Sequence, residues 1–141
     1  MIQRKQTIWL LLAAVMGFLF TQIPLFIAKL ADGSEKKFSA PESLILFAFG
    51  IAVALLAVFT IFLFKNRPLQ LRLTIIGILA SLAIIGLEVW QLDQFKQNNA
   101  VSSGSYYWGS LFPIASLLFF ALAAGGIRKD EKLVKSLDRL R

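Results

Sequence analysis

Four long runs of apolar residues, separated by short polar segments, dominate the chain. An α-helix needs about 20 mostly apolar residues to cross the hydrocarbon core of a bilayer. The runs meet that length and predict membrane-spanning helices at approximately residues 7–28, 43–64, 71–92 and 106–127. Short connections between them predict an antiparallel order. We therefore expect an all-α integral membrane protein, an antiparallel bundle of four transmembrane helices in one membrane domain that covers residues 1–141.

The first run is expected to remain as a helix rather than to be removed as a signal peptide. The apolar region of a secretory signal has about 7–15 residues and ends at a small-residue cleavage site. Here the uncharged run from Gln6 to Ala28 is longer and ends without an A-x-A pattern.

Local signals predict the helix ends. Ser39-Ala40-Pro41-Glu42 matches the S-x-x-E capping box and predicts the start of the second helix. Lys65-Asn66-Arg67-Pro68 predicts its end, because proline cannot continue the helical hydrogen-bond ladder. Pro24 and Pro113 fall inside predicted helices, where each predicts a kink.

Each predicted helix carries small residues four positions apart, a spacing that lets membrane helices approach closely. The pairs are Ala13/Gly17, Ala48/Ala52, Gly50/Ala54, Gly77/Ser81 and Ala121/Gly125. Their presence in all four helices favours a compact bundle over independent spans.

Composition and charge add an orientation. The chain is 57% hydrophobic and 16% charged, whereas soluble domains average about 45–50% apolar and about 25% charged residues. Lys and Arg number 15 against eight Asp and Glu, a formal charge of +7. Eleven of these cations fall in the N-terminal segment, the loop between the second and third spans, and the C-terminal segment. Because short cytoplasmic segments are rich in Lys and Arg, we expect both termini to be cytoplasmic.

The residues that most enzymes use are missing. The chain contains neither Cys nor His, which excludes disulfides, thiolate zinc sites, histidine-ligated haem and Ser-His-Asp triads. It also lacks HExxH, GxSxG and P-loop motifs. We expect no catalytic residues, no cofactor and no metal site, and predict that the protein is not an enzyme.

Glu88 is the one ionisable side chain inside a predicted span. Ionisable residues at membrane depth are costly and often functional. Counted from Leu71, Glu88 lies roughly 24 Å along the helix, which favours an interfacial or structural position. Gln22 is expected at a similar level and could form a hydrogen bond with it. Glu88 and Gln22 are therefore a candidate intramembrane polar site.

The C-terminal tail, residues 128–141, predicts a short basic amphipathic helix on the cytoplasmic side. Leu133, Leu137 and Leu140 are spaced to share one helical face. Such a helix can lie on an anionic leaflet or bind a partner's groove, or it can be a solvated extension of the fourth span. The candidate contact residues are Arg128, Lys129, Lys132, Leu133, Lys135, Leu137, Arg139, Leu140 and Arg141. A nucleic-acid partner is not expected, because no aromatic platform accompanies the charge.

Both ends of the chain resemble a known family. The segments are 1–10, which begins Met-Ile-Gln-Arg-Lys, and 127–141, which contains Arg128-Lys129-Asp130-Glu131-Lys132-Leu133-Val134. They are similar to domain of unknown function 4293 (DUF4293), small four-span proteins of the bacterial inner membrane, and the likeness covers essentially the whole chain. The resemblance implies a multi-pass protein of the bacterial cytoplasmic membrane and assigns no catalytic residues.

These observations predict a non-enzymatic accessory or scaffold subunit. Its partners are expected to be the lipid bilayer and a membrane or cytoplasmic protein that contacts the tail, and a homo-oligomer is possible. The alternative is a small transporter or lipid-binding membrane protein that uses Glu88 and Gln22.

Overall fold

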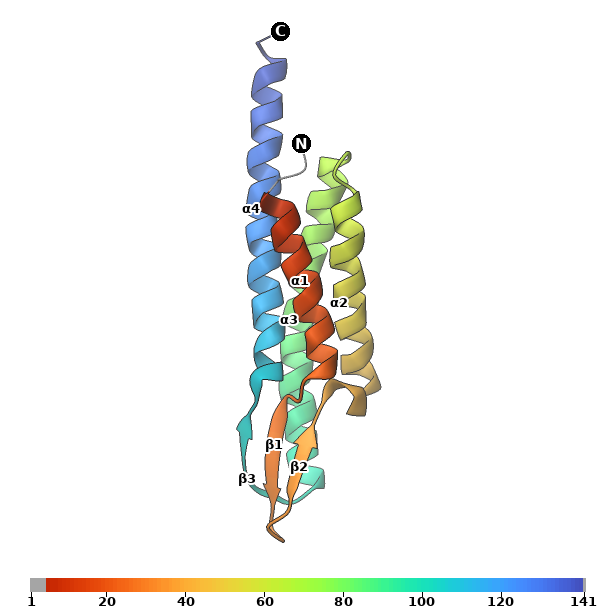
Figure 1. Cartoon of the computed structure of the whole chain (residues 1–141), viewed down its shortest axis with the longest axis vertical. Coiled ribbons are helices and arrows are strands. Elements are labelled where there is room, and N and C mark those ends of the chain that lie inside the picture. The colour runs from red at the N-terminus through yellow and green to blue at the C-terminus, as the bar shows by residue number, and fades with distance from the viewer. Residues whose placement is uncertain (1–4, 141) are drawn as a thin grey trace.

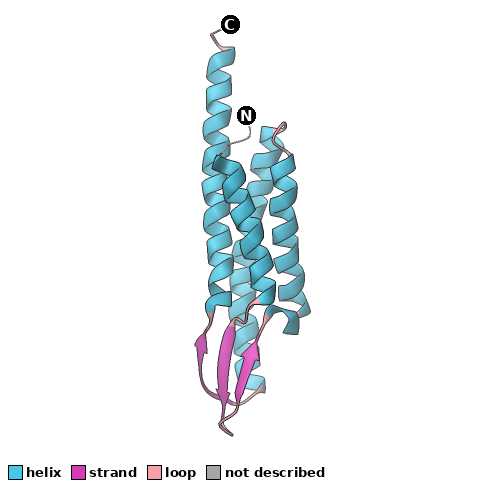
Figure 2. Ribbon diagram, viewed as in Figure 1, coloured by secondary structure: helices cyan, strands magenta, loops and turns pink. Residues whose placement is uncertain are grey.

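Four helices lie side by side along the long axis, and a small sheet extends from one end of the bundle (Figures 1 and 2). The computed structural model describes residues 5–140, so Arg4 and Arg141, which contribute to the predicted charge pattern, lie outside the described residues. The helices are α1 (Lys5–Gln22), α2 (Leu44–Phe62), α3 (Arg67–Asn98) and α4 (Phe112–Asp138). Helix α1 packs between α2 and α4, and α3 packs against the same two helices.

The two ends of the bundle differ. The start of α1, the turn between α2 and α3, and the C-terminal end of α4 lie together at one end, which we call the tail end (Figure 1). The strands lie at the opposite end, which we call the sheet end. Successive helices therefore run in opposite directions, as the short connections predict.

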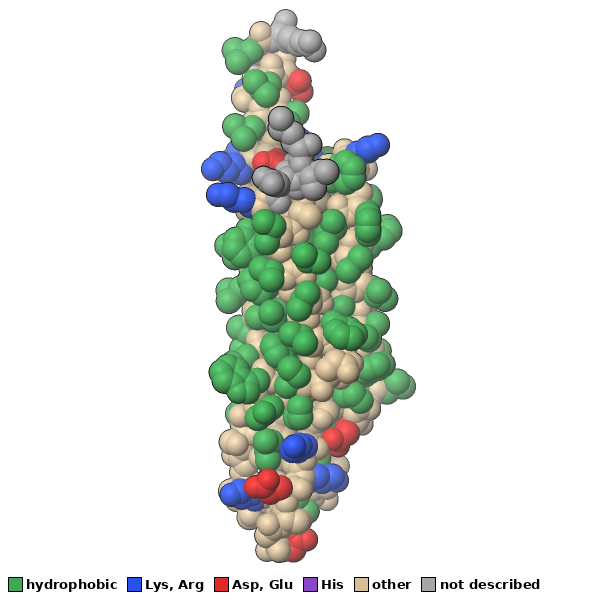
Figure 3. Space-filling view, viewed as in Figure 1, with side chains coloured by type: hydrophobic (Ala, Val, Ile, Leu, Met, Phe, Trp, Pro, Cys, Tyr) green, Lys and Arg blue, Asp and Glu red, His purple; other side chains and the backbone are tan. Residues whose placement is uncertain are grey.

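Within residues 5–140, three helical segments are long and apolar enough to cross a membrane. They are α2, α3 and the segment Trp108–Asp138, which contains α4. In Figure 3, apolar side chains cover the middle of the molecule, and charged side chains gather toward its two ends. Helix α1 has 18 described residues with polar residues at both ends. Its outward face is nevertheless apolar, because Ile8, Leu11 and Phe18 are each more than half exposed.

The sheet was not predicted. It consists of β1 (Phe26–Leu30), β2 (Glu35–Phe38) and β3 (Val101–Tyr106), all antiparallel, in the order β2-β1-β3. Its inner face packs on the last turns of α3, where the rings of Phe38 and Phe95 are 4.9 Å apart. The 32 residues of α3 span about 48 Å, more than the roughly 30 Å hydrocarbon core. The surplus length supports the sheet.

The structure corrects the predicted position of the first helix and of both prolines. The predicted segment 7–28 continues past the end of α1 at Gln22, and its last residues form the beginning of β1. Pro24 lies between the helix and the strand. Pro113 lies in the first turn of α4, where a missing N–H costs no helical hydrogen bond. Neither proline kinks a helix.

Two further helix ends differ from prediction. Ser39 precedes a single 3-10 turn, Ala40–Glu42, and makes no side-chain cap. The cap of α2 is Ser43, whose Oγ accepts a hydrogen bond from the Leu46 N–H at 3.5 Å. The tail is not a separate helix, because α4 continues unbroken to Asp138.

The turn between α2 and α3 confirms its sequence signal. Helix α2 ends at Phe62, and α3 begins at Arg67 with Pro68 in its first turn. The Asn66 side chain accepts a hydrogen bond from the Leu69 N–H at 3.3 Å and caps α3.

Small residues set the distances between helices at three of the predicted pairs. A Cβ atom at Gly17 would lie 3.0 Å from the Ala54 backbone nitrogen, so α1 and α2 are in close contact there. At Gly77 a Cβ atom would lie 2.5 Å from the Phe120 ring, which fills the space between α3 and α4. Gly50 makes a similar approach to α1.

The other pairs are on the outside. Ala48 and Ala52 are exposed on α2, and Ala121 and Gly125 are exposed on α4. On α4, Ala123 and Ala124 are buried instead. Four-residue spacing identifies a face of a helix but does not say whether a helix or lipid covers it.

Gly77→Ala is expected to destabilise the bundle by about 1–3 kcal/mol, because the new methyl group would overlap the Phe120 ring. Gly86→Ala on the same helix is the matched control, since nothing lies within 4 Å of its added Cβ. The measurement is the midpoint of unfolding in mixed micelles of increasing SDS content. Equal midpoints for the two variants would contradict the packing described for Gly77.

The turn of the β1–β2 hairpin is expected to respond to pH. The Asp32 carboxylate accepts hydrogen bonds from the Ser34 hydroxyl at 2.6 Å and the Ser34 N–H at 2.9 Å, and these bonds lower the pKa of Asp32. Because the folded-state pKa is depressed, the stabilisation is present above the usual carboxyl range and is lost on acidification through the folded pKa. The Ser34 amide resonance should shift over that acidic range, and Asp32→Asn should abolish the shift. A wild-type resonance that does not titrate would show that the turn forms without the carboxylate.

Candidate functional site

The tail is a long exposed segment of the molecule. Helix α4 extends beyond the tail end of the bundle (Figure 1). From Lys132 to Leu140 every residue is exposed. Three leucines on this segment are 56%, 65% and 85% exposed, and they are Leu133, Leu137 and Leu140. We call these three residues the leucine stripe.

Four cations of the tail share a different side of the helix. They are all exposed, and they are Arg128, Lys132, Lys135 and Arg139. Their intervals of four, three and four residues place them in one row along an α-helix. The row lies well away from the leucine stripe around the helix, so the tail presents two distinct surfaces. Lys129 lies four residues before Leu133 and is therefore on the side of the leucine stripe.

The side of α4 that faces the bundle is apolar within the bundle and carries charged residues in the tail. Within the bundle this side carries Phe120 and Ile127, which are fully buried. Beyond the bundle the same side carries Glu131, Val134 and Asp138, three residues that line a groove.

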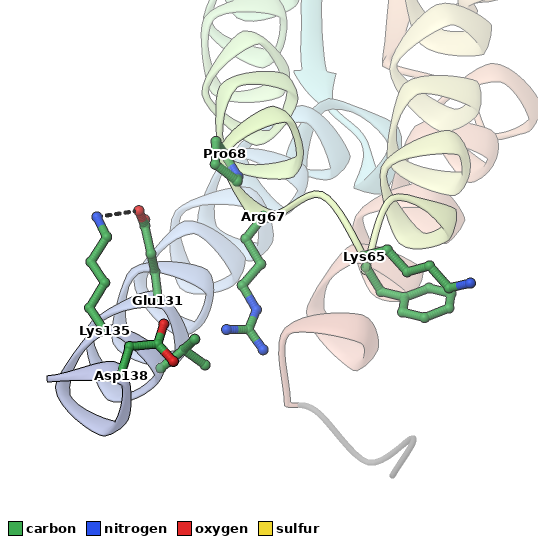
Figure 4. Close-up of a pocket in the computed structure, with 8 residues that line it drawn as sticks. Lys65, Arg67, Pro68, Glu131, Lys135 and Asp138 are labelled. Carbon is green, nitrogen blue, oxygen red and sulfur yellow. Dashed lines mark hydrogen bonds and ion pairs between the residues drawn. The ribbon is translucent and has the colours of Figure 1, made fainter. Parts of the chain in front are cut away.

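The groove lies between the tail and the turn from α2 to α3 and has a volume of about 650 Å³ (Figure 4). Glu131 accepts a hydrogen bond from Lys135 at 2.8 Å, so both side chains are engaged within the tail. Arg67 extends into the space beside the tail, and Lys65 extends away from it. The lining thus mixes three cations with two acids, and it has no concentration of one sign that would favour a small ionic ligand.

Glu88 and Gln22, predicted as a pair, are not brought together. Glu88 lies on the inward side of α3 and is only 4% exposed, and its Oε1 atom has no hydrogen-bond partner. Gln22 is exposed at the end of α1, and its Nε2 atom donates to the Thr21 hydroxyl at 3.1 Å. The hydrogen bond between Gln22 and Glu88 is not formed.

Sequence reasoning missed the polar character of the inward side of α3. The buried residues of this helix include Gln70, Thr74, Ser81 and Glu88. Gln70, Thr74, Gly77 and Ser81 follow one another at intervals of four, three and four residues. That heptad spacing is a signal present in the sequence, and it shows that these residues share a face.

The described acidic side chains do not form a metal-binding cluster. Within residues 5–140, no group of three Asp or Glu residues is placed so that it could hold a metal ion.

No curated protein and no solved structure matches the chain. One family model matches residues 2–140, and its description is "Domain of unknown function (DUF4293)". Since this match covers essentially the whole chain, the protein belongs to the DUF4293 family.

Proposed function

We propose that this protein is a non-enzymatic accessory or scaffold subunit of the bacterial cytoplasmic membrane. It spans the membrane four times and uses the leucine stripe of its tail to hold a helix of another protein. The observation that carries the proposal is the unbroken course of α4 from Phe112 to Asp138.

The four-span topology is supported by α1 and by the ends of the bundle. The outward face of α1 is as apolar as those of its neighbours, with Leu11 and Phe18 each 54% exposed. A soluble environment would not favour such a surface, whereas lipid would. Trp90 and Trp108, which are exposed at the sheet end, fit the aromatic belt of a membrane interface.

The charge distribution supports a cytoplasmic tail end. The polar sheet suits the opposite aqueous side, because open sheet edges do not occur within hydrocarbon. The tail end holds most of the cations of the chain, and the positive-inside rule places such an end in the cytoplasm.

The direction of the tail favours a protein partner over the membrane surface. An amphipathic helix binds a bilayer by lying in the plane of the interface. The tail instead continues along the axis of the bundle (Figure 1). Arg139 is 11 residues beyond Arg128, so it lies about 16 Å farther from the membrane. The leucine stripe would therefore stay in water unless a protein covers it.

The tail sequence favours a different protein over a second copy of this chain. Leu133, Leu137 and Leu140 have the spacing of a coiled-coil seam. Residues 128–139 carry five cations and three acids, so two parallel tails from one membrane would repel each other. A partner helix with apolar residues opposite the leucines and a net negative charge fits this surface.

The alternative function, a small transporter or lipid-binding protein, has one observation in its favour. A carboxyl oxygen of Glu88 is buried without a hydrogen-bond partner, and ionisable side chains at membrane depth often belong to ion pathways. The exposed position of Gln22 removes it from that site.

Photo-crosslinking in native membranes tests the docking proposal. A photoreactive amino acid replaces Leu133 or, as the matched control, Leu118, which lies on the same helix and is also 56% exposed. The expected result is one discrete heterologous product from position 133, crosslinked to an amphipathic helix of the partner, and none from position 118. Adding Leu137→Asp should reduce the product about tenfold or more, because burying a leucine is worth about 1.5–3 kcal/mol.

Four outcomes would overturn the proposal. Position 133 could give no discrete product, it could react with lipid as position 118 does, or its product could be a dimer of this chain. The fourth, a product that persists unchanged with Leu137→Asp, would show that the leucine stripe is not the contact.

A further inference from the structure

Among the described helices, α3 buries the most polar side chains. Between Gln70 and Glu88 its inward side carries two hydroxyls, an amide and a carboxyl, and all four side chains are at most 4% exposed. The other helices bury fewer polar side chains, namely Gln6 and Thr21 on α1, Thr60 on α2 and Ser116 on α4. The outward side of α3 is apolar, with Ile76 and Leu79 at least half exposed. Helix α3 therefore keeps its polar groups away from lipid and inside the bundle.

The hydroxyl and amide donors on the inward side of α3 are hydrogen bonded to backbone carbonyl oxygens. Thr74 Oγ1 donates to the Gln70 carbonyl oxygen at 2.8 Å, and Ser81 Oγ donates to the Gly77 carbonyl oxygen at 2.9 Å. The Gln70 amide donates through Nε2 to the Thr60 carbonyl oxygen at 3.1 Å. These donors are satisfied by the protein itself.

The atoms that remain unsatisfied are acceptors. Among the described residues, two buried side-chain oxygens have no hydrogen-bond partner, and they are Gln70 Oε1 and Glu88 Oε1. Both belong to the inward face of α3, one toward each end of the bundle. Leaving such an atom buried without a partner is unfavourable. A small ligand that supplies positive charge or a donated proton would satisfy either oxygen in turn, whereas an anion would satisfy neither.

The charges around this face favour a monovalent cation. Helices α1, α2 and α4 contribute no acidic or basic side chain to the interior beside it. Lys5 lies at the tail end, and the charges of α4 begin at Arg128. On α3 itself, Glu88 is the only acidic or basic residue between Arg72 and Asp93. One carboxyl group can balance one positive charge.

We propose that the inward face of α3, from Gln70 through Thr74 and Ser81 to Glu88, lines a path for a small monovalent cation through the bundle. The path is closed in this structure, because its side chains are buried, and Ile84 fills the interval between Ser81 and Glu88. It opens when α3 moves away from its neighbours and water reaches the face. The proposal does not depend on the docking role of the tail.

Thiol accessibility tests the path, and the absence of native cysteine makes every introduced thiol unique. Ser81→Cys and Thr74→Cys are compared with Ala13→Cys on α1 and Ala57→Cys on α2, which replace residues of equal burial on other helices. Membrane vesicles are treated with a cationic or an anionic methanethiosulfonate reagent of similar size. Ser34→Cys, in the exposed turn of the sheet, reports full reactivity. Reaction in SDS confirms that each thiol is intact.

The cationic reagent is expected to modify Ser81→Cys about tenfold faster than the anionic reagent, a preference equivalent to about 1.4 kcal/mol. It should also modify Ser81→Cys about tenfold faster than it modifies Ala13→Cys or Ala57→Cys. Adding Glu88→Gln should remove the preference for the cationic reagent, while Asp93→Asn, an exposed acid on the same helix, should leave it unchanged.

Equal slow rates at Ser81→Cys, Thr74→Cys and the two alanine positions would overturn the path, since they would show a face that stays dry. Fast reaction with both reagents would overturn the cation assignment. A preference that survives Glu88→Gln would overturn the role of Glu88.

Discussion

Lipid offers no hydrogen bonds, so a chain inside a membrane must satisfy its polar groups internally. This constraint explains most of the structure. Helices fill the apolar middle of the molecule, and the sheet with its open edges lies at one end (Figures 2 and 3). Thr60, Thr74 and Ser81 each donate to a carbonyl oxygen of the preceding turn. The two exceptions, at Gln70 and Glu88, therefore stand out as the places where the bundle has unused capacity to bind.

Close packing is the second requirement, because apolar burial alone does not hold helices together in lipid. The contacts of Gly17 with α2 and of Gly77 with Phe120 supply it. They fix α1 and α3 on opposite sides of α2 and α4 and keep the polar face of α3 inside. The tail follows from the same arrangement. Since α4 is held along its bundle segment and is unbroken, the tail extends along the bundle axis.

The sequence predicted what depends on local pattern. Apolar length located the four helices, and Pro68 located the turn between α2 and α3. It did not predict the sheet, because the residues of β1 pair with residues of β3 that lie 71 to 80 positions later, and β3 consists mostly of small polar residues. The count from residue 71 could not show the surroundings of Glu88 for a related reason. The helix continues to Asn98 beneath the sheet, and Glu88 is buried inside the bundle. The prediction of an interfacial or structural position for Glu88 stays a prediction.

The central claim is that α1 completes a four-helix bundle whose outer surface faces lipid. Spin labels attached at Leu11 and Phe18 through single introduced cysteines test it in bilayers, because oxygen concentrates in lipid and a nickel chelate stays in water. The account predicts frequent collisions with oxygen and rare collisions with the chelate at both positions, with the reverse at a label on Ser34 in the sheet turn. Frequent collisions with the chelate at Leu11 and Phe18 would show that α1 lies in water, and would contradict the four-span bundle.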